Sequence, residues 1–274
     1  MKKLIKIIAV MVAVLLTVGL LVVANGFVGN PISKLIVTHE AKEYLEETYP
    51  DTDYYIDSVA YSFKTGGYYA HVKSHSSEDT YFSVDYSLFG EMKYDNFTSR
   101  VTDGFNTWNR INHEYNEITD NILKQLPYEL DMAYGAIKMY HKGEGRLDFG
   151  LDIANLELDK QYNLTELGKS YGKVTLYVYD EEVTSEKASE ILLAVKNLFN
   201  EANQSFYAID LVLRLPQNEE IKDWQDENTI RIEEILSKNL VEGRVLEEVE
   251  RVILETETYY HEMDDAKQQE QMQG

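Results

Sequence analysis

The chain contains no cysteine among its 274 residues. Disulfide bonds, thiolate catalysis and cysteine-ligated zinc or iron–sulfur sites are therefore excluded. Attachment of a lipid to an N-terminal cysteine is excluded for the same reason. Folding must then rest on a hydrophobic core, and the hydrophobic share of 44% is enough to form one in a chain of this length.

Basic residues are also scarce. The sequence has 26 Lys and Arg against 48 Asp and Glu, which gives a formal net charge of −22. Such a charge repels the phosphates of nucleic acids, so we expect no nucleic-acid partner. The same charge also keeps a surface hydrated, so by itself it does not identify a ligand.

Complete catalytic motifs are missing as well. Three His-Glu pairs begin the pattern of helical zinc peptidases, but the second histidine is replaced by Glu43, Glu117 and Asp265. Gly168-Lys169-Ser170 resembles the end of a phosphate loop, but Asn163 stands where that loop needs its first glycine. We therefore expect no metal site, no cofactor, no catalytic residue and no enzymatic activity.

The N-terminus does contain one long apolar run. Residues 7–24 include no charge and would reach about 27 Å as a helix, close to the thickness of a bilayer core. Lys2, Lys3 and Lys6 precede the run. The excess of positive charge on the cytoplasmic side of membranes then predicts a single-pass anchor with a cytoplasmic N-terminus and an extracytoplasmic body.

A second interpretation of this run stays open. A secretory signal peptide has the same order of charges followed by apolar residues, and small residues near Ala24 could form its cleavage site. The protein would then be secreted. We therefore expect residues 1–30 to be an anchor or a signal segment, and a helix buried in a protein core is the third interpretation of the apolar run.

The next part of the chain predicts a first α+β domain over residues 31–127. Apolar residues at helical spacing indicate a helix over 33–49, and alternation over 54–95 indicates four antiparallel strands. A long amphipathic helix over 101–126 follows, and we expect it to cover the first sheet.

A second α+β domain is predicted over residues 128–265. Its clearest part is a β-α-β unit over 173–215, whose strands should pair in parallel. A turn is expected at residues 143–145, a polar linker over 216–228, a strand over 229–236 and a closing helix from Val245. The glutamine-rich tail, residues 266–274, is expected to be disordered.

Several stretches resemble one family. Val28–Lys34, Phe63-Lys64-Thr65-Gly66 and Glu78-Asp79-Thr80 resemble the N-terminal part of the YfjL-like proteins of Gram-positive bacteria, and Tyr171–Asp180 and Phe206–Asp210 resemble their C-terminal part. This resemblance implies a membrane-associated extracytoplasmic protein of unassigned function. It implies no catalytic residue. By its order of elements alone, the first domain also resembles the PepSY-type domains that accompany envelope peptidases.

Tyrosine is unusually frequent, with 21 residues, and many of them fall on the first predicted sheet. Tyrosine suits strands, and it also suits recognition of peptides or glycans. We expect a binding surface on this sheet and its polar loop, formed by Tyr68, Tyr69, His71, His75, Glu78 and Asp79.

Taken together, these features predict a non-catalytic envelope protein that binds another envelope protein or a peptide. An envelope hydrolase whose site is scattered along the sequence is the alternative.

Overall fold

The computed structural model describes residues 2–142, 146–216 and 229–273. Its contacts divide the chain into two compact units. The first comprises residues 1–107 with 154–159, and the second comprises 108–153 with 160–274. The fold is α+β, as expected, and each unit contains one four-stranded sheet.

Two helices open the first unit, α1 (Lys2–Val28) and α2 (Pro31–Thr48). Gly29 separates them with a φ of +75°, a conformation that favours glycine, and an added Cβ there would meet the Tyr68 hydroxyl at 2.6 Å. Asn30 caps α2 by accepting a 2.7 Å hydrogen bond from the Ser33 N–H. The break between the helices therefore follows from the local sequence.

The apolar run of residues 7–24 lies within α1, and its described large side chains are exposed, such as Val10 at 63% and Leu15 at 70%. Among the described residues, none of the helices combines the length and the apolar character that a membrane span requires. The segment is helical, as expected, but the transmembrane helix of the expected fold is not supported by this finding.

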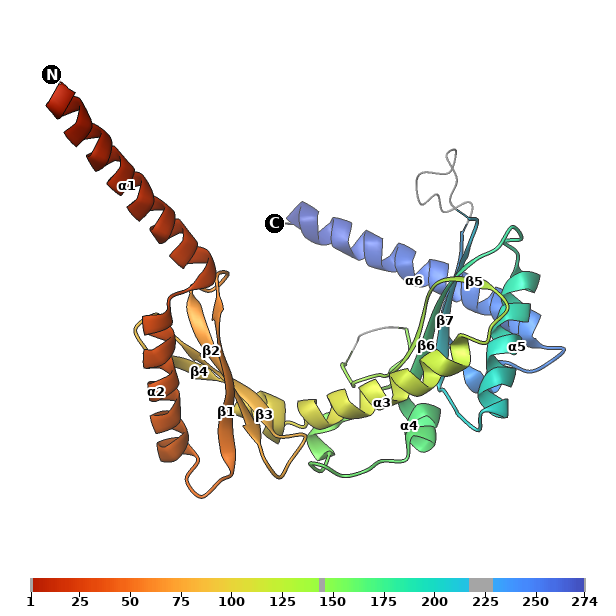
Figure 1. Cartoon of the computed structure of the whole chain (residues 1–274). Helices are drawn as coiled ribbons and strands as arrows, with labels where there is room; N and C mark the ends of the chain where they lie inside the picture. Colours follow the sequence, from red (N-terminus) through yellow and green to blue (C-terminus); the bar gives the residue numbers. More distant parts are fainter. Residues whose placement is uncertain (1, 143–145, 217–228, 274) are drawn as a thin grey trace. The chain divides into compact units, whose positions relative to one another are not determined.

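The first sheet contains β1 (Tyr54–Ser62), β2 (Gly67–Ser74), β3 (Tyr81–Tyr86) and β4 (Met92–Asp95). The strands follow one another in space and every pairing is antiparallel, which confirms the expected meander. Helix α2 lies along this sheet (Figure 1). Val37 and Ala41 from α2 share one core with Ala70, Val72 and Val84 of the sheet.

The long helix α3 (Phe105–Leu123) begins later than the sequence indicated, and a short π-helix, η1 (Thr98–Thr102), precedes it. Gly104, with a φ of +78°, separates the two. We expected this helix to cover the first sheet, but Ile122 and Leu123 pack in the core of the second unit. The units accordingly divide after Thr107, whereas the expected boundary lay after Pro127. An amphipathic stripe shows that a helix has a buried face, but it does not show which core receives that face.

The second sheet contains β5 (Glu129–Ile137), β6 (Gly172–Tyr179), β7 (Ala208–Arg214) and β8 (Thr229–Leu236), in that spatial order. Strands β6 and β7 are parallel and flank α5 (Ser185–Glu201), which confirms the β-α-β unit. The other two pairings are antiparallel, so the sheet is mixed. Helix α5 and the first turns of α6 (Val245–Gln273) bury apolar side chains against one face of this sheet. Figure 1 shows both helices beside the sheet.

Some elements of the structure differ from those that the sequence predicted. Helix α4 (Leu164–Tyr171), capped by Asn163, was not expected. Two single turns, η2 (Ile153–Asn155) and η4 (Ser237–Asn239), are also present. Helix α6 continues to Gln273, where we expected a disordered tail, because Ala, Lys, Gln, Glu and Met all favour helix. The expected turn at 143–145 and most of the expected linker lie outside the described residues.

Gly168 provides a test of how α4 packs. A Cβ at this position would collide with the Ser205 carbonyl oxygen and would lie 2.7 Å from the Tyr115 ring. We predict that Gly168→Ala lowers the free energy of unfolding by about 1–3 kcal/mol, because backbone and a buried ring must move. Urea unfolding followed by circular dichroism measures this change. Ser170→Ala, at an exposed position of the same helix, is the control, and equal stability of both variants would contradict the packing role.

Candidate functional site

The structure places the residues of the expected binding surface on both faces of the first sheet. Tyr68 is buried, accepting a 2.7 Å hydrogen bond from the Asn30 N–H and donating a 2.8 Å bond to the Asn30 carbonyl oxygen. Asp79 is buried as well, and it exchanges backbone-to-carboxylate bonds of 3.0 and 2.9 Å with Asp159. Both residues therefore stabilise the first unit and do not face solvent.

The other expected residues lie toward solvent. Tyr69 and His71 alternate with the buried residues of β2 and lie on the opposite face of the strand. The His75 ring stacks on Tyr55 with centroids 4.2 Å apart. His75 and Glu78 line a shallow depression of about 520 Å³ together with Asp159. The expected surface is thus reduced to these four residues.

One pair on this face has a geometry known from hydrolases. The Nδ1 atom of His71 and the hydroxyl of Ser83 are 2.9 Å apart. A serine beside a histidine can be activated as a nucleophile when a third group orients the histidine. Among the described residues, no carboxylate hydrogen-bonds to His71, so that third group is lacking in this conformation.

The second sheet holds a cluster of charged side chains that our sequence reasoning missed. Lys173 on β6 lies 2.8 Å from the Asp210 carboxylate on β7 and 3.3 Å from the Glu234 carboxylate on β8. Lys138, just beyond β5, lies 3.0 Å from the same carboxylate of Glu234. Lys173 and Asp210 lie on the face of their strands that points away from the main core. The sequence signal that could have indicated this cluster is a pair of opposite charges in two strands that were expected to be neighbours.

Glu234 is the centre of this cluster. It is only 1% exposed, and its φ of +53° is uncommon for a residue other than glycine. The conformation arises at a β-bulge, where Glu233 and Glu234 together stand opposite Asp210. In this position the Glu234 N–H donates a 2.8 Å hydrogen bond to Asp210, and the Glu234 carboxylate accepts a 2.5 Å bond from the Leu147 N–H.

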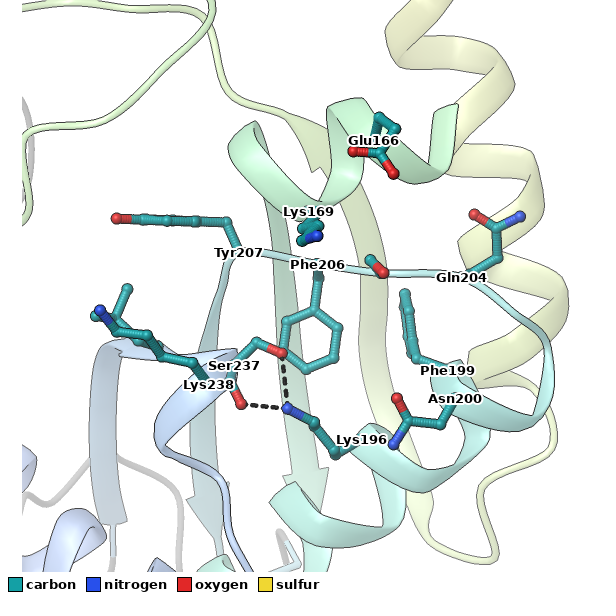
Figure 2. Close-up of a pocket in the computed structure, with 12 residues that line it drawn as sticks. Glu166, Lys169, Lys196, Phe199, Asn200, Gln204, Phe206, Tyr207, Ser237 and Lys238 are labelled. Atoms are coloured by element: carbon teal, nitrogen blue, oxygen red, sulfur yellow. Dashed lines mark hydrogen bonds between the residues drawn. The ribbon is translucent and has the colours of Figure 1, made fainter. Parts of the chain in front are cut away.

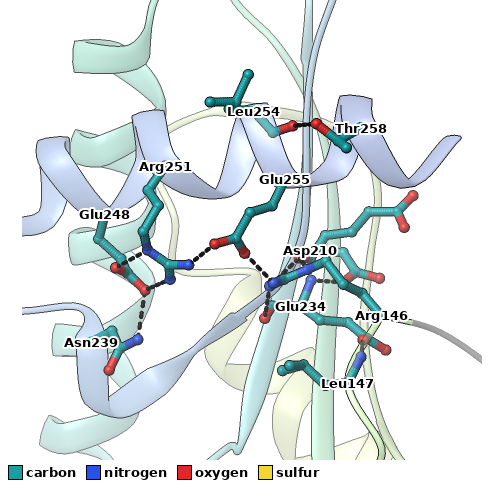
Figure 3. Close-up of polar contacts among 11 residues, drawn as sticks. Arg146, Leu147, Asp210, Glu234, Asn239, Glu248, Arg251, Leu254, Glu255 and Thr258 are labelled. Carbon is teal, nitrogen blue, oxygen red and sulfur yellow. Dashed lines mark hydrogen bonds and ion pairs between the residues drawn. The ribbon is translucent and has the colours of Figure 1, made fainter. Parts of the chain in front are cut away.

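A chain of polar contacts extends from the bulge to α6 (Figure 3). Arg146 donates a 2.8 Å hydrogen bond to the Glu234 carbonyl oxygen and forms a 2.5 Å ion pair with Glu255. Arg251 pairs with Glu255 and also with Glu248, the latter at 2.6 Å. The segment that carries Arg146 and Leu147 is thereby joined to both β8 and α6.

Two cavities lie on the same side of the sheet, and Tyr177 lines both of them. One, of about 360 Å³, is also lined by Tyr134, Lys173 and Asp210. The other, of about 470 Å³, is also lined by Val212. We call Tyr134, Lys173, Tyr177, Asp210 and Val212 the second-sheet face. Aromatic rings beside fixed charges are typical of sites that recognise a ligand.

The pKa shifts of Lys173 and Glu234 argue against proton transfer by these two groups, whereas burial raises the pKa of the neighbouring Asp210. Burial alone would lower the pKa of Lys173, but the charges and hydrogen bonds of Asp210 and Glu234 outweigh it, so its pKa is raised. Burial alone would raise the pKa of Glu234, but the Leu147 N–H and the two lysines outweigh it, so its pKa is lowered. Both groups are therefore charged at neutral pH, whereas a general base needs a pKa near neutrality.

Metal binding has no visible basis in the part of the chain that is described. Across residues 2–142, 146–216 and 229–273, no group of three or more His, Asp or Glu is arranged to hold an ion. The carboxylates of the second-sheet cluster are already paired with lysines.

Replacing Glu234 tests the cluster. We predict that Glu234→Gln lowers the free energy of unfolding by about 3–5 kcal/mol, because two partly buried lysines lose a shared counter-charge. Glu250→Gln, at an exposed position of α6, should change it little.

Comparing the wild type with Glu234→Gln at different pH values tests the lowered pKa of Glu234. A carboxyl whose pKa is lowered on folding stabilises the fold fully above its unfolded pKa, about 4.3 for glutamate, and this stabilisation is lost as the pH falls through the lower folded pKa. The difference in stability between the wild type and Glu234→Gln should therefore be constant near neutral pH and shrink below about pH 4.3. Urea unfolding at a series of pH values measures it. A difference that grows on acidification would contradict the assignment.

No curated protein matches the chain. Among solved structures, it is similar to a DUF5037 family protein from Ruminococcus gnavus, with 12% identity over 68% of this chain and 77% of that chain. The TM-score of that pair is 0.21, too low to carry an argument.

The family models are more informative. The model of the YfjL-like N-terminal domain matches residues 2–96, and the model of the YfjL-like C-terminal domain matches residues 114–250. The two matched segments lie largely in the first and the second unit, respectively. The chain belongs to the YfjL-like family.

Proposed function

We propose that this chain is a non-catalytic binding protein of a bacterial envelope, held at the membrane by α1, which binds a peptide segment of another envelope protein through the second-sheet face. The observation that carries the proposal is that Tyr177 lines two cavities at once, next to a fixed Lys173–Asp210 ion pair. A tyrosine ring supplies apolar contact area and a hydroxyl in one rigid side chain. The hydroxyl can exchange hydrogen bonds with a peptide backbone, while the neighbouring ion pair keeps the shape of the surface fixed.

The role of the membrane rests on the N-terminal sequence. Residues 7–24 carry no charge, Lys2, Lys3 and Lys6 precede them, and the rest of the chain is strongly acidic. This order supports a cytoplasmic N-terminus and an extracytoplasmic body. The exposed apolar side chains of α1 are also of the kind that lipid would cover.

Fractionation of cells that express the full chain tests the anchor. We predict that the protein stays in the membrane pellet after a carbonate wash and that N-terminal sequencing finds Lys2 and Lys3 still attached, because α1 is retained in lipid. Leu15→Glu with Leu16→Glu should release the protein, since each charge within a span costs about 2.5–3.5 kcal/mol. Thr17→Ser is the control. A mature protein that begins after Ala24 would replace the anchor by secretion, and an intact chain in the soluble fraction would contradict both.

Binding of the purified full chain to a peptide array tests the second-sheet face. We predict that Tyr177→Ala weakens binding of the selected peptides by about tenfold or more, since loss of a central aromatic contact commonly costs at least 1–2 kcal/mol. Leu254→Ala, which removes a large exposed side chain from α6, should leave the affinity unchanged.

Two results would replace this assignment. A loss of binding on Tyr69→Ala or His75→Ala, with Tyr177→Ala unaffected, would move the recognition site to the first sheet. Cleavage of the peptides, abolished by Ser83→Ala, would instead favour an envelope hydrolase that uses the His71–Ser83 pair.

A further inference from the structure

A third cavity, of about 440 Å³, lies elsewhere in the second unit and has an unusual charge (Figure 2). Its lining includes three lysines from three different segments: Lys169 of α4, Lys196 of α5 and Lys238 of η4. In a chain with 48 acidic and 26 basic residues, such a local excess of positive charge runs against the composition. One acidic side chain, Glu166, lines the same cavity.

These lysines differ from those of the second-sheet cluster. Lys138 and Lys173 are paired with carboxylates, whereas none of the three cavity lysines forms an ion pair with a carboxylate in the described part of the chain. Lys196 instead donates hydrogen bonds to the carbonyl oxygen of Ser237 and, at 3.2 Å, to its hydroxyl, as Figure 2 shows. Neutral acceptors do not neutralise the ammonium charge.

Burial makes this arrangement costly for Lys196. The side chain is half-buried, and the loss of hydration lowers its pKa. A lysine ammonium has three N–H donors, and Ser237 accepts two of these bonds. An anion bound in the cavity would supply the missing counter-charge and a third acceptor.

The remaining lining suits a small ligand with polar and apolar parts. Asn200 and Gln204 offer amide groups, and Ser205 offers a hydroxyl. Phe199, Phe206 and Leu236 form the apolar part of the wall. Phe199 and Phe206 are buried and contact each other with ring centroids 4.9 Å apart, so the apolar wall is held in place.

We propose that this cavity binds the oxyanion of a small ligand, a phosphate or a carboxylate, through Lys169, Lys196 and Lys238. Ionised oxygens form the strongest hydrogen bonds with ammonium groups. The site does not depend on the proposed peptide binding, because no residue of the second-sheet face lines the cavity.

Nuclear magnetic resonance of the full chain in detergent, with ¹³C at the lysine ε-carbons, tests the proposal. We titrate with inorganic phosphate and, separately, with acetate at constant ionic strength. Saturable shifts are expected at Lys169, Lys196 and Lys238, and the bound anion should raise the pKa of Lys196. Tighter binding of phosphate would identify a phosphate ligand, and equal or tighter binding of acetate would identify a carboxylate ligand.

Variants separate this site from general charge effects. Lys196→Met should weaken anion binding by about tenfold, the effect of losing one charge-assisted hydrogen bond. Lys187→Met removes the same charge from the same helix, but Lys187 already pairs with Asp180 and Glu190, so binding should not change.

If Lys196→Met fails to fold, the double variant Lys169→Met with Lys238→Met replaces it, since both side chains are exposed. No saturable binding of either anion by the wild type would overturn the proposal. An equal loss of binding in Lys187→Met and in the cavity variants would overturn it too.

Discussion

The second unit depends on the contacts of one buried carboxylate, that of Glu234, with Lys138, Lys173 and the Leu147 N–H. A non-glycine residue with a positive φ costs about 1–3 kcal/mol, and a buried charge without partners costs more. Here two lysines and the Leu147 N–H surround the carboxylate, so the bulge that creates the strain also delivers the charge to its partners. One side chain thereby holds together β8, β6 and the segment after β5.

The first unit is organised by tyrosine hydroxyls that bond to other parts of the unit. Tyr68 bonds to both backbone groups of Asn30, and Tyr61 donates to the Gly26 carbonyl oxygen at 3.0 Å, which positions the end of α1 and the start of α2. Tyr44 and Tyr49 donate to the Asp95 carboxylate at 2.5 and 2.6 Å, which ties the end of α2 to β4. A tyrosine can fill the core with its ring and still satisfy a polar group at the edge. This dual use accounts for part of the high tyrosine content.

The lysines of the second unit fall into two groups with different consequences. Lys138 and Lys173 are neutralised within the fold, so their charges contribute to structure and to the shape of the second-sheet face. Lys169, Lys196 and Lys238 lack such neutralisation in the described part of the chain, and their positive potential stands out against a chain of net charge −22. Recognition of a peptide and recognition of an anion are therefore proposed for separate places in the same unit.

The sequence was sufficient for the class of fold and for most of the secondary structure, although α4 and the helical end of α6 were not expected. Apolar periodicity is a local property, so it located α2, the four strands of the first sheet and the β-α-β unit. Tyr68 and Asp79 of the expected surface are buried, because alternation along a strand shows that two faces exist but not what covers each. The apolar face of α3 was likewise recognised from the sequence, but the core in which its Ile122 and Leu123 pack was not.

Only the tertiary structure revealed the charged cluster and the lysine-lined cavity. Lys138 and Glu234 are 96 residues apart and meet through strand order and a bulge, neither of which has a local signature. Lys196 and Ser237 are 41 residues apart and meet where α5 passes η4. The sequence by itself determined which residues could be buried and which could carry charge. The strand order and register decided which charges became neighbours, because long-range pairing brings together side chains that no local pattern connects.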